Sequence, residues 1–283
     1  MWRLPWNQRT VPHAVLDFVR GCNIVCRSCY NTAPPGMKTL QEVSEELDLL
    51  MSIRRLDSVS ILGGEPTLHP DLAAIASLIR RRGLRVELFT NGLLLDERLA
   101  STLADAGVDT IALHIERGQK RPDFDEGELP DVLRLLEEKG RLVARCGMQA
   151  GMCLTIDRDS IADLPHMMKA FLESEVLTVC LLTLHIAPRR IKWVSGDVRT
   201  LLRGALDEDA SGEDERAVPL TDVRDVLEGA FGLSPFAYVG SNLDPEDPRW
   251  LSYVVARSAP SPGIVEWVAL RPGLVEPLFM EAS

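Results

Sequence analysis

The chain of 283 residues lacks a long uninterrupted apolar run, a Gly-x-Gly-x-x-Gly loop and a second group of cysteines. Because no run is long enough to span a bilayer or form a signal sequence, we expect a cytoplasmic protein. The missing glycine fingerprint disfavours a dinucleotide-binding sheet. Six cysteines in a chain of this length do not make a disulfide scaffold, and no cysteine follows Cys180.

The chain also has fewer positively charged than negatively charged residues. Lys and Arg number 31 against 42 Asp and Glu, which gives a formal net charge of −11. Proteins that coat nucleic acids or membrane surfaces need clustered Lys and Arg, so we expect neither as a partner. The hydrophobic content of 46% is enough to bury one large core.

Short apolar runs alternate with amphipathic helical stretches along the first two thirds of the chain. The runs are 14–19, 58–62, 85–89, 110–115, 148–156 and 177–186, and the helical stretches are 39–53, 71–82, 96–106, 130–139 and 160–172. Such strand-then-helix units predict parallel strands joined by right-handed crossovers. A whole or partial barrel is the natural arrangement, with functional residues at the carboxyl ends of the strands.

The last third has a different pattern. Residues 207–216 are acidic and interrupted by Gly and Ser, which is typical of a mobile connection. A helix is predicted over 223–231, followed by two strands, 251–257 and 263–270, separated by a turn at 258–262. We therefore divide the chain into a barrel core (1–190), a mobile acidic connection (191–219) and a substrate-selecting cap (220–283).

Three cysteines lie close together directly after the first apolar run. Cys22, Cys26 and Cys29 have the spacing C-x3-C-x2-C. Three thiolates can hold three irons of a four-iron cube and leave one iron open for chemistry. The alternative is a zinc site completed by a ligand from elsewhere in the chain. Structural zinc sites usually show two CxxC-like pairs, and here there is one group.

A second motif, Gly63-Gly64-Glu65-Pro66, ends the second apolar run. Together the two motifs resemble the radical S-adenosylmethionine (radical SAM) superfamily. The resemblance implies a partial (β/α)6 TIM-like barrel with a small α+β cap, a [4Fe–4S] cluster on the three cysteines, and S-adenosylmethionine on the fourth iron. It implies that one electron from a flavodoxin- or ferredoxin-type reductant cleaves this cosubstrate to a 5′-deoxyadenosyl radical, which abstracts hydrogen from a substrate. Gly63, Gly64 and Glu65 would contact the methionine amine.

Other positions match the family in part. The residue before the third cysteine is usually aromatic and lies by the adenine, whereas here it is Ser28, and Tyr30 could supply some of that contact. Thr90-Asn91-Gly92 ends the third run and matches a motif often seen there, which makes Asn91 a cofactor contact. A Ser-x-Asp pattern near the cosubstrate is replaced by His114-Ile115-Glu116.

Alternation with period two assigns the remaining strand residues to two faces. His114 and Glu116 should face the lumen from the fourth run, Thr155 from the fifth and His185 from the sixth. We expect His114, Glu116 and His185 to be catalytic and Thr155 to line the cofactor pocket. Cys153 shares the lumen face, where a buried filler is its simplest role.

The missing second cysteine group favours an enzyme with one cluster and a small-molecule substrate, for example in natural-product biosynthesis. Two alternatives remain open. One is an activating enzyme that installs a radical on a protein partner, and the other is a non-catalytic iron–sulfur protein.

Overall fold

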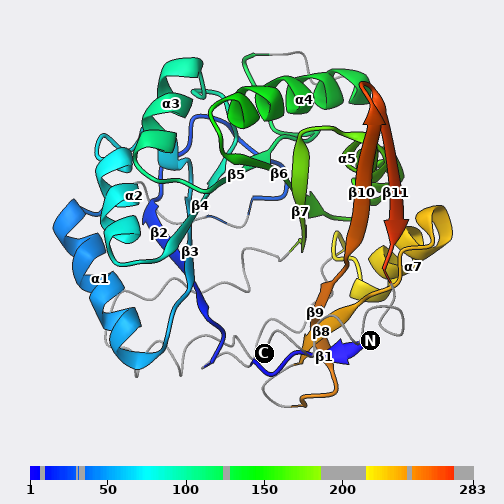
Figure 1. The fold of residues 1–283 in the computed structure, drawn as a ribbon, viewed down its shortest axis with the longest axis horizontal. Coiled ribbons are helices and arrows are strands. Elements are labelled where there is room, and N and C mark those ends of the chain that lie inside the picture. Colours follow the sequence, from blue (N-terminus) through cyan, green and yellow to red (C-terminus); the bar gives the residue numbers. More distant parts are fainter. Residues whose placement is uncertain are drawn as a thin grey trace.

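The computed structural model describes residues 1–6, 10–29, 31, 36–123, 128–185, 215–240 and 244–270. Six parallel strands form one sheet in the order of the sequence: β2 (His13–Val19), β3 (Ser58–Gly63), β4 (Arg85–Thr90), β5 (Thr110–His114), β6 (Gln149–Ile156) and β7 (Leu177–Leu184). Five helices cover its convex side: α1 (Leu40–Ile53), α2 (Leu72–Arg81), α3 (Glu97–Asp105), α4 (Leu129–Arg145) and α5 (Leu164–Glu173) (Figure 1). This arrangement confirms the predicted partial barrel.

The helices begin where their capping residues lie. Thr39 and Glu42 form a capping box at the start of α1: the Glu42 amide donates to the Thr39 hydroxyl, and the Thr39 amide donates to the Glu42 carboxylate. Asp96 caps α3 by accepting from the Leu99 amide at 2.7 Å. The stretch predicted as one helix over 160–172 starts as a 3₁₀ turn, Ile161–Asp163, and α5 begins only at Leu164. Pro165, which has no N–H to donate, lies in the first turn of α5, where no donor is needed.

The two faces of the sheet differ in polarity, as the alternation predicts. Outward-facing strand residues such as Leu16, Ile61 and Leu88 are at most 1% exposed and pack beneath the helices. The inner face is polar at β2, β3 and β4. There the His13 ring lies 2.8 Å from the Ser58 hydroxyl and 3.0 Å from that of Ser60, and Ser60 donates to Glu87 at 2.6 Å.

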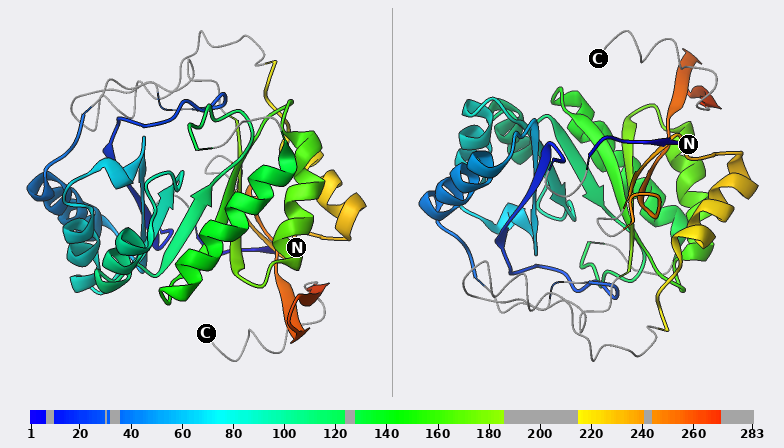
Figure 2. Two further views of the ribbon diagram at one scale, coloured as in Figure 1. Left: turned by 90° about the horizontal axis from the view of Figure 1, so that it is seen from above. Right: turned by 90° about the horizontal axis from the view of Figure 1, so that it is seen from below.

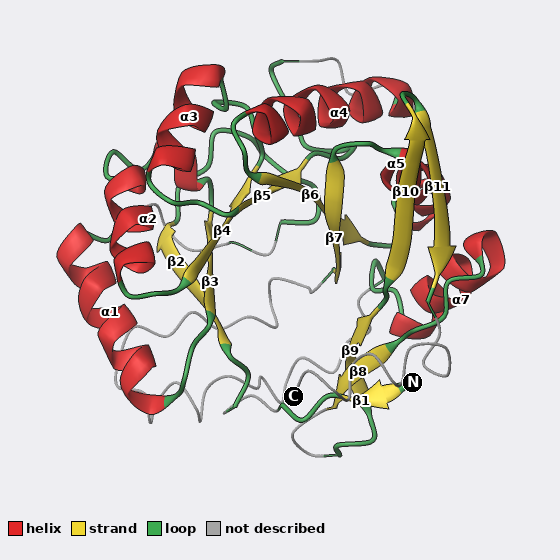
Figure 3. Cartoon of the chain, in the orientation of Figure 1, coloured by secondary structure: helices red, strands yellow, loops and turns green. Residues whose placement is uncertain are grey.

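The described part of the C-terminal region, residues 215–240 and 244–270, adds a helix and four strands: α7 (Leu220–Phe231), β8 (Ala237–Gly240), β9 (Pro248–Ser252), β10 (Val255–Ser261) and β11 (Ile264–Ala269). Strand β8 pairs with β9 and also, in parallel, with β1 (Trp2–Arg3). The three-stranded sheet therefore contains the first residues of the chain, and Figure 2 shows the N-terminus beside the strands of the C-terminal region. Helix α7 and strand β11 pack on α5, on the outer side of the barrel (Figure 3).

One predicted strand boundary in this region is wrong. The stretch predicted as a strand over 251–257 is divided between β9 and β10, and β10 continues through the segment predicted as the turn. The reversal occurs instead at Gly263, whose φ of 77° lies in the left-handed region that glycine adopts readily. Arg257 anchors the hairpin by donating to the carbonyls of Phe171 and Ser174 at the end of α5 and of Leu177 at the start of β7. Most of the predicted mobile connection, residues 191–214, lies outside the described residues.

In the described segments, no helix is both long and apolar enough to span a membrane.

Candidate active site

The cysteine loop follows β2 at the carboxyl end of the barrel, where the loops after β3, β4, β5 and β6 converge on it. Its last part is a turn in which the Cys29 amide donates to the Cys26 carbonyl at 3.3 Å. Cys22 and Cys29 are exposed, Cys26 is half-buried, and all three thiols are free of disulfides. The predicted ligands thus lie on one short loop, at the end of the barrel where function was expected.

Gly63 and Gly64 allow the end of β3 to approach this loop closely. A Cβ atom on Gly63 would lie 2.2 Å from the Val19 carbonyl oxygen, and one on Gly64 would lie 2.1 Å from that of Gly21. The backbone uses this proximity, because the Glu65 amide donates to the Gly21 carbonyl at 2.8 Å. The two glycines are therefore needed to seat the residue that directly precedes Cys22.

The Glu65 carboxylate is buried, 1% exposed, and joins the ends of β3 and β4. One oxygen accepts from the amide and hydroxyl of Thr67 and, at 2.6 Å, from the Thr90 hydroxyl. The other accepts from the Asn91 amide at 2.8 Å. Four hydrogen bonds from the protein itself thus occupy this side chain.

Asn91 connects the end of β4 to the first cysteine. Its side-chain nitrogen donates to the Asn23 side chain at 2.7 Å and lies 3.8 Å from the Cys22 sulfur. Its side-chain oxygen accepts from the Leu93 amide at 2.9 Å, which fixes the orientation of the amide group. The structure therefore brings Asn91 beside the predicted cluster ligands, as expected from the Thr-Asn-Gly motif.

The loop after β5 pairs with the cysteine loop, which the sequence did not reveal. The Arg27 amide donates to the Gly118 carbonyl at 2.8 Å, and the Val25 amide donates to the Gln119 carbonyl at 3.3 Å. Arg121, whose side chain is fully buried, donates to the Asn91 carbonyl at 2.7 Å and forms a two-pronged ion pair with Asp123. Gln119 and Arg121 have no periodic or motif signal, so only the structure identifies them.

His114, Glu116 and Thr155 form one cluster at the ends of β5 and β6. The His114 Nε2 atom lies 3.1 Å from a Glu116 oxygen and 3.4 Å from the Thr155 hydroxyl, and the Thr155 amide donates to Glu116 at 2.8 Å. Burial alone would lower the pKa of His114, but the adjacent Glu116 carboxylate outweighs it and raises that pKa. The structure thus brings together three side chains that the alternation had assigned to the lumen face.

The other predicted site residues have separate positions. His185 is buried beside the end of β6, where its amide donates to the Ile156 carbonyl at 2.9 Å. Ser28 is buried and donates to Asp157, the first residue after β6. Asp157 was not predicted from the sequence, although its position directly after β6, whose alternate side chains face the lumen, was a usable signal. Tyr30 lies outside the described residues.

The electrostatics of the thiols indicate what the loop can hold. Burial, reinforced by Cys29, Glu116 and Cys22, raises the pKa of Cys26 to about 12, and burial also raises that of Cys22. The neighbouring sulfurs and the Glu116 carboxylate thus disfavour the charged form of Cys26, an effect that a bound cationic group would offset. Within the described segments, no three His, Cys, Asp or Glu side chains surround a single point where one ion could bind. A four-iron cube takes each thiolate on a different iron, and three free thiols on one loop fit it.

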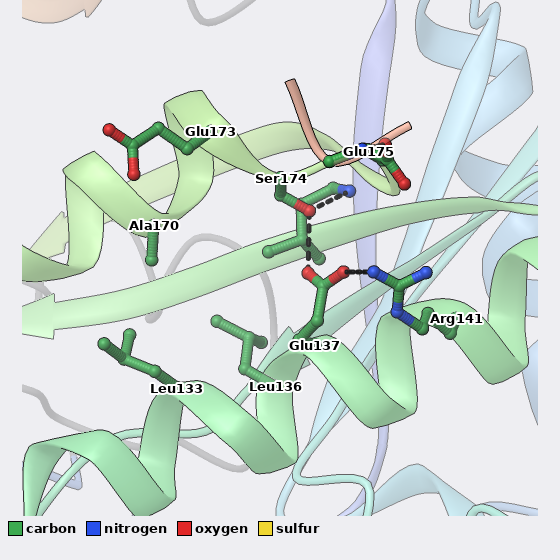
Figure 4. Close-up of a pocket in the computed structure, with 10 residues that line it drawn as sticks. Leu133, Leu136, Glu137, Arg141, Ala170, Glu173, Ser174 and Glu175 are labelled. Carbon is green, nitrogen blue, oxygen red and sulfur yellow. Dashed lines mark hydrogen bonds and ion pairs between the residues drawn. The ribbon is translucent and has the colours of Figure 1, made fainter. Parts of the chain in front are cut away.

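A separate cavity of about 220 Å³ lies outside the barrel, between α4 and α5. Its lining includes Glu137, which accepts from the Ser174 hydroxyl at 2.8 Å and pairs with Arg141 at 2.7 Å (Figure 4). None of the predicted site residues lines it.

Comparison with known proteins agrees with the geometry at the carboxyl end of the barrel. Residues 16–148, which include the three cysteines and Gly63–Glu65, match the family model of the radical SAM superfamily. Fe-coproporphyrin III synthase from Methanosarcina barkeri is 27% identical over 202 residues, which are 69% of this chain and 49% of that protein. Pre-heme d1 synthase from Dinoroseobacter shibae is 26% identical over 162 residues, 56% of this chain and 40% of that protein. The chain thus aligns with at most about half the length of these curated relatives.

The fold has solved counterparts as well. The native anSMEcpe structure with bound AdoMet and Kp18Cys peptide superposes with a TM-score of 0.54 at 16% identity, covering 78% of this chain and 60% of that one. At this identity the likeness concerns the fold alone. The sequence match, the shared barrel and the cysteine loop agree: residues 16–148 form a radical SAM superfamily domain, whose cofactors are a [4Fe–4S] cluster and S-adenosylmethionine.

Proposed function

We propose that this protein is an enzyme that cleaves S-adenosylmethionine reductively at a [4Fe–4S] cluster and acts on a small molecule. The observation that carries the proposal is the loop with Cys22, Cys26 and Cys29, onto which the ends of four neighbouring strands converge. When bound, the cluster and S-adenosylmethionine supply a 5′-deoxyadenosyl radical that abstracts hydrogen from the substrate. An external one-electron donor of the flavodoxin or ferredoxin type would provide the electron.

The chain's own residues have distinct tasks in this proposal. Cys22, Cys26 and Cys29 bind the cluster, and Asn91 orients the loop beside Cys22. Because the Glu65 carboxylate is occupied by the protein, backbone carbonyls of the Gly63–Glu65 segment would accept from the methionine ammonium group. His114 and Glu116 are placed to exchange a proton with a bound hydroxyl or amine. The reason is that the two side chains share a proton between the imidazole nitrogen and the carboxylate.

The polarity of the lumen supports a small polar substrate. Burial is the main cause of the raised pKa of the Cys153 thiol. The nearby Glu116 carboxylate raises this pKa further, and Glu87 adds to the effect. Ser60 and His13 continue the polar surface toward β2. Carboxylates, a hydroxyl and an imidazole accept hydrogen bonds from hydroxyl and ammonium groups, so a substrate rich in these groups is favoured over a polycarboxylate.

Anaerobic reconstitution tests the proposal. The protein is loaded with iron and sulfide and reduced with dithionite, and 5′-deoxyadenosine is quantified after S-adenosylmethionine is added. We expect 5′-deoxyadenosine from the wild type and from Cys146→Ala, because Cys146 caps α4 away from the loop. Cys26→Ala should lose both the cluster absorbance and the product. A fully loaded wild-type protein that forms no 5′-deoxyadenosine would refute the proposal.

A further inference from the structure

The turn between the second and third cysteines is held by a single carboxylate. Cys26 and Cys29 are its first and fourth residues, since the Cys29 amide donates to the Cys26 carbonyl at 3.3 Å. Arg27 and Ser28 are its two central residues, and both contact Asp157. The Ser28 hydroxyl donates to one oxygen of Asp157, and the Arg27 guanidinium lies 3.4 Å from the other.

Asp157 is itself rigidly placed. Its side chain is 0% exposed, and the oxygen that faces Arg27 also accepts from the Ser160 amide at 2.8 Å and the Asp159 amide at 3.1 Å. Its own amide donates to the Ser160 hydroxyl at 2.8 Å. Burial would raise the pKa of Asp157, but hydrogen bonds from Ser28 and Ser160 lower it overall, so the group is ionised at neutral pH.

We propose that Asp157 is a positioning residue that sets the geometry of the Cys26–Cys29 turn, and so the placement of the cluster relative to S-adenosylmethionine. The inference rests on the proposed ligand role of the two cysteines. A turn whose corner residues are both tied to a fixed carboxylate has little freedom to change the distance between its end residues. Ser28 thereby gains a role in this chain at the position that is usually aromatic in the family.

The first test uses metal-free protein, so that it does not depend on the cluster. In a Cys22→Ser background, dibromobimane cross-links Cys26 to Cys29, and peptide mass spectrometry identifies the product. Asp157→Asn and Ser28→Ala should each slow this cross-linking, and combining them should slow it no further, because they break one shared contact. Ser28→Thr, which keeps the hydroxyl, should restore the wild-type rate.

The second test uses the reconstituted protein. Loss of groups that orient metal ligands typically reduces affinity or activity ten- to a hundredfold. We expect Asp157→Asn and Ser28→Ala to raise the KM for S-adenosylmethionine about tenfold, with a smaller change in kcat. The electron paramagnetic resonance spectrum of the reduced cluster should shift as well.

Asp163→Asn is the matched control, because it removes a carboxylate from the same β6–α5 connection and its contact is with Arg117 at 2.7 Å. Wild-type cross-linking rates in both Asp157→Asn and Ser28→Ala would overturn the inference. A wild-type protein that loads no cluster would refute the proposed function instead, and the cross-linking result would still decide the role of Asp157. Should Asp157→Asn fail to fold, Ser28→Ala alone carries the test.

Discussion

At the scale of single residues, the His114–Glu116 pair links charge to stability. The folded protein raises the pKa of His114, because the Glu116 carboxylate at 3.1 Å outweighs the effect of burial. A group whose pKa is raised on folding binds protons more tightly in the folded state. Its stabilising effect is therefore fully present below the pKa of the unfolded state, about 6.5. The effect is lost as the pH rises through the higher pKa of the folded state.

Replacing Glu116 with Gln should reverse this effect. The pKa of His114 should fall, since burial remains and the carboxylate is gone, and nuclear magnetic resonance titration of the imidazole measures it. The free energy of unfolding should fall most below about pH 6.5, and the difference from wild type should shrink at higher pH. Glu97→Gln, on the exposed start of α3, serves as the control. An unchanged His114 pKa would show that Glu116 is not its main partner.

At the scale of secondary-structure elements, the close approach of the end of β3 to the cysteine loop requires a glycine. Gly64 lies where any side chain would meet the Gly21 carbonyl, so β3 could not reach the cysteine loop with another residue there. Gly229, by contrast, is exposed within α7, and a Cβ atom there would have open space. The two glycines therefore provide a matched pair of positions for substitution by alanine.

Gly64→Ala should destabilise the protein by about 1–3 kcal/mol, the usual cost of overpacking, and should reduce the iron content after reconstitution. Gly229→Ala should stabilise it by about 0.5–1 kcal/mol, because alanine is the better helix former. Chemical denaturation and iron analysis measure both effects. Equal behaviour of the two variants would contradict the close approach of β3 to the loop.

Strong periodic signals determined how well the elements could be predicted from the sequence. The six apolar runs became the six strands of the sheet, with boundaries shifted by no more than a few residues. Strand β1, with two residues, has too short a pattern to be visible, and its partner β8 lies near the other end of the chain. The turn between β10 and β11 was misplaced because backbone geometry at Gly263, not composition, sets where the chain reverses.

Within the site, the motif residues could be predicted, but most of the groups that hold them in place could not. The cysteines follow from their spacing and the His114–Glu116 pair from alternation, whereas Gly63–Glu65 and Asn91 were predicted from the resemblance to the radical SAM family. Gln119 and Arg121 act through backbone pairing and a buried ion pair between segments distant in sequence. Such contacts depend on how loops meet in space, and a single sequence does not record that.

At the scale of the whole molecule, the segment that leads into α7 contacts the cysteine loop. Arg216, just before α7, donates to the Arg27 carbonyl at 2.9 Å, and its own carbonyl accepts from the Arg158 amide at 3.0 Å. Segments of the cysteine loop, the β6–α5 connection and the entry to the cap therefore meet at one place. A change at Arg216 would therefore act directly on the backbone next to Cys26.

Arg216→Ala should loosen this junction. Loss of a hydrogen bond from a charged donor costs about 1.5 kcal/mol, so amide hydrogen exchange in peptides covering 24–29 and 215–219 should accelerate about tenfold. Mass spectrometry of exchanged, digested protein measures it. Arg224→Ala, which removes an exposed arginine paired with Asp225 on α7, should leave exchange in those peptides unchanged. Equal exchange in the two variants would mean that the cap and the loop are not coupled.

The pairing of Trp2 with Ala237 also has a kinetic consequence. Almost the whole chain lies between these residues, so the pairing closes a very large loop and gains little from two residues of strand. The barrel, built from neighbouring strand–helix units, can form first, and the β1–β8 contact then completes the fold. Trp2, whose ring lies 6.0 Å from that of Phe236, would report this final step by its fluorescence.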